Sequence, residues 1–101
     1  MTSSPDSTRA MLAPFRQDID ALDSQIVALL EKRFAIVKEV GAFKTRHKIE
    51  IVQSHRVDEV IERVGALAKA HNVPETLIRD FYTAMIDQAH RIENSIKEDV
   101  S

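Results

Sequence analysis

The sequence predicts an all-α fold with three helices per chain, one of them very long, in an intertwined helical homodimer. Composition is the first observation: of the 101 residues, 44% are hydrophobic and 30% are charged, while only two are glycine and three are proline. Apolar residues also recur at spacings of three and four over three separate segments, which is the period of an amphipathic helix. The first of these segments is too long for a monomer of this size, and this length indicates a dimer.

The first predicted helix begins near Ala13 and ends between Thr45 and Lys48. Its apolar seam consists of Leu12, Phe15, Ile19, Leu22, Ile26, Leu29, Ile36 and Val40. Pro14 is compatible with the first turn of a helix, which places the start nearby. Residues 1–9 are small and polar, so we expect a disordered tail there and a single helical domain over residues 10–101.

The length of this helix is the argument for a dimer. About 32 helical residues extend for about 48 Å. A compact monomer of this size has a diameter of only about 33 Å. The helix would therefore carry leucines and isoleucines beyond its own globule, where a second copy of the chain would cover them.

Two shorter helices are predicted after an extended connector at residues 49–53. Ser54 is a suitable N-cap for a helix over residues 55–71, and Asn72 and Pro74 mark a break before a helix over residues 74–97. The second helix is expected to face inward with Val57, Val60, Ile61, Val64, Leu67 and Ala68. The third is expected to do so with Leu77, Ile78, Phe81, Met85, Ala89, Ile92 and Ile96.

Composition also excludes several classes of function. The net charge of −2 gives no general affinity for nucleic acid. The absence of cysteine excludes disulfides, a thiol nucleophile and thiolate metal sites. No apolar run is long enough for a membrane span or a signal core, so we expect a cytoplasmic protein. The four histidines are scattered along the chain, and no metal site is predicted.

Two cations occupy positions of the first helix where the seam should be apolar. Arg33 lies four residues after Leu29 and three before Ile36, and Lys44 lies four after Val40. The eleven positions from Arg33 to Lys44 turn a helix about three times, so both side chains should point the same way.

Other polar residues lie beside apolar stripes. Arg16 borders the first stripe, Arg56 precedes inward-facing Val57, and Glu93 shares a helix face with Ala89. Gln53 closes the connector. Several cations converging on an all-α interior indicate a pocket for a small dicarboxylate, because arginine binds carboxylates through two parallel hydrogen bonds.

Four of these charged residues also have a simpler explanation as part of a solvated helix face. Long side chains can lie along the helix surface and pair with a neighbour, and an exposed pair within a helix contributes only about 0.3–0.5 kcal/mol. The alternative pairs are Arg33 or Lys44 with Glu31, Glu39 or the partner protomer, Arg16 with Asp20, and Glu93 with Lys97. Periodicity alone favours this interpretation for each residue taken singly.

Taken together, the residues resemble a known family. The runs are LAPFRQDIDALDSQIVALLEKRFAIVKEVGAFK, HRVDEVIERV and FYTAMIDQAHRIE. They resemble the all-helical chorismate mutases over about residues 12–96. The resemblance implies a domain-swapped dimer in which each long helix contributes to both active sites, in agreement with the independent argument from length.

The resemblance also implies roles for individual residues. Arg33, Lys44 and Arg56 would bind the two substrate carboxylates in one protomer, with Arg16 supplied by the other. Lys44 and Glu93 would flank the ether oxygen whose C–O bond breaks. The implied reaction converts chorismate to prephenate in one unimolecular step, without a cofactor.

Four positions depart from the common family pattern, and they widen the choice of substrate. Gln53 stands where many members have an acidic residue, Val57 where they have a glutamate, Ala89 where they have a small hydroxyl residue, and Glu93 where they often have glutamine. The anchors for the carboxylates and the ether oxygen are present, while the contacts to the ring substituents are altered. Isochorismate-pyruvate lyase activity, rearrangement of 4-amino-4-deoxychorismate, and a catalytically silent helical dimer are the alternatives.

Overall fold

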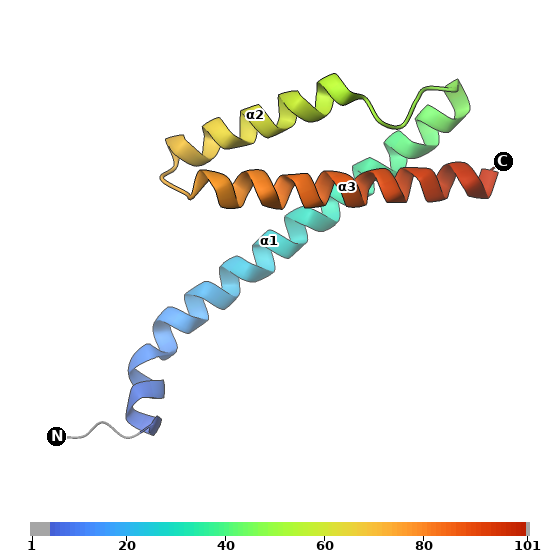
Figure 1. Ribbon diagram of the computed structural model, residues 1–101. Helices are drawn as coiled ribbons and strands as arrows, with labels where there is room; N and C mark the ends of the chain where they lie inside the picture. The colour runs from blue at the N-terminus through green and yellow to red at the C-terminus, as the bar shows by residue number, and fades with distance from the viewer. Residues whose placement is uncertain (1–4, 101) are drawn as a thin grey trace. The chain divides into compact units, whose positions relative to one another are not determined.

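The computed structural model describes residues 5–100, which form three helices joined by two short connections. The helices are α1 Pro5–His47, α2 Ser54–Ala70 and α3 Glu75–Val100 (Figure 1). No strand occurs within residues 5–100, so the all-α prediction is confirmed. The chain divides into two compact units, Met1–Arg33 and Phe34–Ser101, and α1 contributes to both.

The long helix begins earlier than the sequence predicted. The predicted start near Ala13 is wrong, because residues 5–9 already belong to α1. The division into a tail at residues 1–9 and a domain over residues 10–101 stays a prediction, and residues 1–4 lie outside the described part of the chain. Asp6 in the first turn interacts favourably with the positive end of the helix dipole. Pro14 therefore stands inside α1. It lacks the N–H that would bond to Ala10, and prolines at such positions bend helices.

The apolar seam of α1 is exposed in the single chain. Its members in the first unit, from Leu12 to Leu29, each retain 37% to 65% of their accessible surface. Ile36 and Val40, in the second unit, are also exposed. A long series of exposed large apolar residues is unusual for a monomeric protein and is typical of a protein-contact surface.

The hydrophobic core lies between α2 and α3. Val60, Val64 and Ile86 form its centre, and burying a side chain of this kind contributes about 1.5–3 kcal/mol. Val57, Ile61, Ile78 and Tyr82 pack around it as half-buried neighbours. Of the residues expected to face inward, Leu67, Leu77 and Phe81 are instead exposed.

The two ends of α2 differ from each other in how well the sequence predicted them. At the C-terminal end, Asn72 has φ of 56° and Val73 N–H donates to the Ala68 carbonyl at 2.8 Å, so the break is confirmed. At the start, the N-cap is Gln53 and not Ser54, and its side chain makes no capping hydrogen bond. The Gln53 amide instead donates to the Glu50 carbonyl at 2.8 Å.

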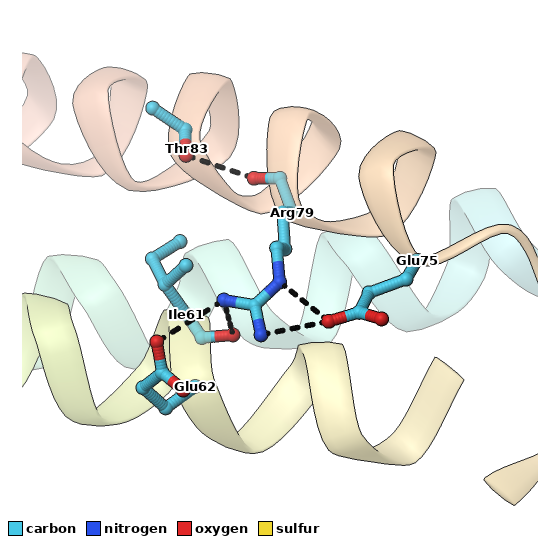
Figure 2. Close-up of polar contacts among 5 residues, drawn as sticks. All are labelled: Ile61, Glu62, Glu75, Arg79 and Thr83. Carbon is cyan, nitrogen blue, oxygen red and sulfur yellow. Dashed lines mark hydrogen bonds and ion pairs between the residues drawn. The ribbon is translucent and has the colours of Figure 1, made fainter. Parts of the chain in front are cut away.

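A polar cluster ties α2 to α3 near their connection (Figure 2). The Arg79 guanidinium donates from Nε and Nη2 to Glu75 Oε1 at 3.0 and 2.9 Å, and from Nη1 to Glu62 Oε1 at 3.2 Å. It also reaches the Ile61 carbonyl at 3.5 Å. The hydrogen bond to Glu75 and then that to Glu62 raise the pKa of Arg79, so the guanidinium stays charged. Gly65 lies beneath it, and a Cβ there would come within 2.5 Å of the guanidinium.

Candidate active site

A largely buried ion pair joins the C-terminal end of α1 to α3. Lys44 Nζ lies 2.8 Å from Glu93 Oε1, and the two side chains are 16% and 5% exposed. The sequence had singled out both residues on separate helices, and the structure brings them together. The simpler interpretation, a surface pair of Glu93 with Lys97 on its own helix, is not the contact that forms.

The pair is an electrostatic contact without the alignment of a hydrogen bond. Glu93 Oε1 is buried and, among the described groups, has no hydrogen-bond partner. The Lys44 ammonium donates its hydrogen bond elsewhere, to the Ile51 carbonyl at 2.7 Å. A buried carboxyl oxygen with unused hydrogen-bonding capacity is costly for a fold to keep, and such groups are found at functional sites.

The end of α1 holds Lys44 in place through the connector. Lys48 adopts φ of 55°, and Ile49 N–H then donates to the Lys44 carbonyl at 2.9 Å. Ile51 is buried and accepts the hydrogen bond from the ammonium of the same lysine. Both the backbone and the side chain of Lys44 are therefore anchored, which restricts the positions open to its charge.

Two small residues lie beside the ion pair. Gly41, one turn before Lys44, is buried against α3, and its Cα faces the Glu93 side chain. Ala89 is buried one turn before Glu93. Ala89 was predicted at the site. Gly41 was missed, although a lone glycine inside a strong helical pattern is a recognised signal of close packing or function.

The three predicted residues on and before the first turn of α2 are described but do not contact the ion pair. Gln53 and Arg56 are exposed, and Arg56 Nη1 lies 4.0 Å from Glu59 Oε1. An exposed pair at that distance holds the guanidinium weakly. Val57 packs on the α2–α3 core. The predicted binding roles of these three residues stay predictions.

The two remaining predicted residues belong to the first compact unit. Arg16 is exposed and Arg33 is half-buried on α1. Their placement at the site also stays a prediction.

An open groove of about 540 Å³ lies between the start of α2 and α3. It is lined in part by Val57 and by the carboxylates of Asp58, Asp80 and Asp87. These acidic side chains repel a dicarboxylate. The groove is therefore not where a dianionic substrate is expected to bind.

Within residues 5–100, no group of three histidine, aspartate or glutamate side chains is placed to hold a metal ion. No helix in the same part of the chain has the length and apolar character needed to cross a membrane. The groups that converge at the candidate site are one ammonium, one carboxyl and one backbone carbonyl.

Comparison with known proteins connects this geometry to a family. Residues 15–94 match the family described as chorismate mutase type II. A 4-amino-4-deoxychorismate mutase of Streptomyces venezuelae is 26% identical over 85 residues, which cover 84% of this chain and 82% of the relative. A chorismate mutase of Methanocaldococcus jannaschii is 27% identical over 88 residues, covering 87% and 89% of the two chains. The T-protein of Enterobacter agglomerans is 32% identical over 85 residues, covering 84% of this chain and 23% of the T-protein.

Proposed function

Because the chain belongs to the chorismate mutase type II family, we propose that it catalyses the rearrangement of chorismate to prephenate. The observation that carries the proposal is the Lys44–Glu93 pair, in which two groups able to contact an ether oxygen meet in a protected position. In this [3,3] rearrangement one C–O bond breaks, one C–C bond forms, and every atom of the substrate is retained. The protein has to hold the reactive conformation and stabilise the charge that develops.

The Lys44 ammonium matches the electronic demand of the reaction. Negative charge grows on the ether oxygen as its bond to carbon lengthens. The Lys44 ammonium, held by the Ile51 carbonyl, is a preorganised donor for that oxygen. Glu93 can donate a second hydrogen bond only when its carboxyl group carries a proton.

The two substrate carboxylates need cationic partners of their own. Arg33 and Arg56 supply them from one protomer, and Arg16 comes from the second protomer. Guanidinium groups suit this task because they bind a carboxylate with two parallel hydrogen bonds in a defined orientation. The exposed, weakly held guanidinium of Arg56 supports this assignment, since little has to be broken before it binds substrate.

The proposed active unit is a homodimer. Its support is the exposed apolar seam of α1, which a second copy would cover.

Rearrangement of 4-amino-4-deoxychorismate is a second candidate reaction. The similarity to the Streptomyces venezuelae enzyme favours it, as does the acidic residue at position 93. A carboxylate there could pair with the positive amino group of that substrate. The two candidates therefore differ in the charge that Glu93 carries during turnover.

The direct test is incubation of the purified protein with chorismate, isochorismate and 4-amino-4-deoxychorismate, with chromatographic identification of the products. Prephenate from chorismate supports the proposal, and faster turnover of the amino substrate supports the second candidate. Salicylate with pyruvate from isochorismate identifies a lyase, and inertness toward all three identifies a silent dimer. Lys44→Ala is the control for contaminating host enzyme, since removal of one preorganised donor should lower the rate at least about 100-fold.

A further inference from the structure

Gly41 is a buried glycine inside α1, near its C-terminal end, and its backbone conformation does not require glycine. No glycine among the described residues has a positive φ, so conformational freedom is not the reason for its presence. Glycine is among the least favourable residues inside a helix. Its presence in α1 therefore needs an explanation from packing.

The explanation lies in the contact of Gly41 with α3. A Cβ at Gly41 would lie 3.1 Å from Glu93 Cγ, 3.2 Å from Glu93 Cα and 3.2 Å from Ile96 Cδ1. Two of these three atoms belong to Glu93, and its Cα is a backbone atom. A backbone atom cannot rotate away as the end of a side chain can, so an added methyl group would push α3 away from α1 at Glu93.

We infer that Gly41 is a positioning residue, whose missing side chain lets the Glu93 carboxyl reach the Lys44 ammonium. Lys44 follows Gly41 by three residues and so lies on the same side of α1. Displacing α3 at Glu93 would lengthen the 2.8 Å contact between the two charged groups. The catalytic consequence rests on the proposed function, while the geometric consequence does not.

The second glycine of the chain provides a matched control. Gly65 is also buried inside a helix, but a Cβ there would meet the Arg79 guanidinium at 2.5 Å. That group is the end of a flexible side chain and lies in the cluster near the α2–α3 connection (Figure 2). Gly65→Ala should disturb the Arg79 contacts and lower the melting temperature without moving Glu93.

Kinetics on chorismate provide the first test. Gly41→Ala should lower kcat at least about 10-fold and change KM less than about 3-fold, because it displaces groups at the breaking bond and leaves the carboxylate anchors in place. Gly65→Ala should keep kcat within about 2-fold. Equal kcat values for Gly41→Ala and the wild type would show that Gly41 serves packing alone.

A second variant separates Glu93 from the neighbouring contact. Ile96→Val removes Cδ1, the atom of Ile96 that a Cβ at position 41 would meet. Combined with Gly41→Ala, it should leave the kcat loss in place, since the contacts with Glu93 persist. Recovery of kcat in the double variant would overturn the inference. If circular dichroism shows that Gly41→Ala alone does not fold, the same measurements are made on the double variant.

A third measurement is independent of activity. Lys44→Met and Glu93→Gln, singly and together, form a double-mutant cycle for urea unfolding at fixed protein concentration. The two substitutions should be coupled in the natural background and additive in the Gly41→Ala background. Equal coupling in both backgrounds would overturn the inference. The unfolding measurement tests the inference even if the wild type turns over no chorismate. Absence of turnover would overturn only the proposed function.

Discussion

At the scale of single residues, the ion pair between Lys44 and Glu93 bears on both the stability of the fold and the proposed chemistry. Removing one partner from a buried pair typically costs about 3–5 kcal/mol, because it leaves a charge without compensation. The same proximity places an ammonium and a carboxyl group where a substrate oxygen could meet both. Glu93 is the less usual choice, since an ionised carboxylate repels the negative charge that develops on that oxygen.

Glutamine at position 93 tests whether a hydrogen-bond donor is needed there. With chorismate, Glu93→Gln should raise kcat/KM about 10-fold, because the amide can accept from Lys44 and still donate to the ether oxygen. The measurement is kcat/KM on chorismate for both proteins under the same conditions. Glu39→Gln, at an exposed position of α1, is the control.

Equal or lower kcat/KM in Glu93→Gln would show that position 93 donates no hydrogen bond to the ether oxygen of chorismate. That result would favour the amino substrate, whose positive group pairs with a carboxylate. Assaying 4-amino-4-deoxychorismate with the same two proteins then decides between the candidates.

Arg33 tests the assignment of the carboxylate anchors. Arg33→Ala should lower kcat/KM at least about 100-fold while the helical circular dichroism is unchanged. Arg33→Lys should also be impaired, because a single ammonium does not reproduce the two parallel hydrogen bonds of a guanidinium. Nearly unchanged kinetics in the alanine variant would show that Arg33 is a surface residue whose side chain lies along the helix.

At the scale of elements, the C-terminal end of α1 both stops the helix and anchors the site. Lys48, with its positive φ, allows the chain to turn back so that Ile49 N–H reaches the Lys44 carbonyl. Ile51 then lies where it accepts a hydrogen bond from the Lys44 ammonium. The α2–α3 pair contributes the hydrophobic core and presents Glu93 from the opposite side.

The strained backbone at Lys48 can be relieved. A side chain in the left-handed region costs about 1–2 kcal/mol, and glycine avoids most of this cost while losing more entropy on folding. Lys48→Gly should therefore raise the melting temperature by about 4 °C. The comparison in a thermal melt is Lys48→Ala, which keeps the Cβ and should stay near the wild type. Equal melting temperatures for the two variants would contradict this account.

At the scale of the whole molecule, the exposed seam of α1 supports the proposed dimer. The isoleucines and leucines of the seam between Ile19 and Leu29 are 52% to 63% exposed, and a large exposed apolar patch is typical of a protein-contact surface. We expect the dimer to be obligate, so dilution toward monomer should reduce helicity and activity together. Sedimentation with parallel circular dichroism and assay at each concentration checks this expectation, and a folded, active monomer would refute it.

Subunit mixing examines whether Arg16 acts across the interface. Arg16→Ala and Lys44→Ala homodimers should each be nearly inactive. After refolding in an equal mixture, half the dimers contain both variants, and each of these has one intact site, so activity should recover to about a quarter of the wild type. No recovery would place Arg16 in the same site as the Lys44 of its own chain.

The sequence alone was sufficient for the three helices and for the candidate status of Lys44, Ala89 and Glu93. Helical periodicity decides which residues share a face, so charged residues on apolar faces stand out by their spacing along the chain. The same periodicity indicated how long α1 is, and that length is the argument for the dimer. The first turns of α1 were missed because a proline such as Pro14 is typical of a helix start. In the structure the helix begins before it and has Asp6 in its first turn.

Only the tertiary structure decided that Lys44 and Glu93 are partners. Glu93 had Lys97 one turn away on its own helix, and periodicity favours that local pair. The pair that forms depends on how closely α1 approaches α3, a distance controlled by steric contact at Gly41. Contacts between helices involve residues far apart in the chain, and no local pattern of spacing records the separation of two helix axes.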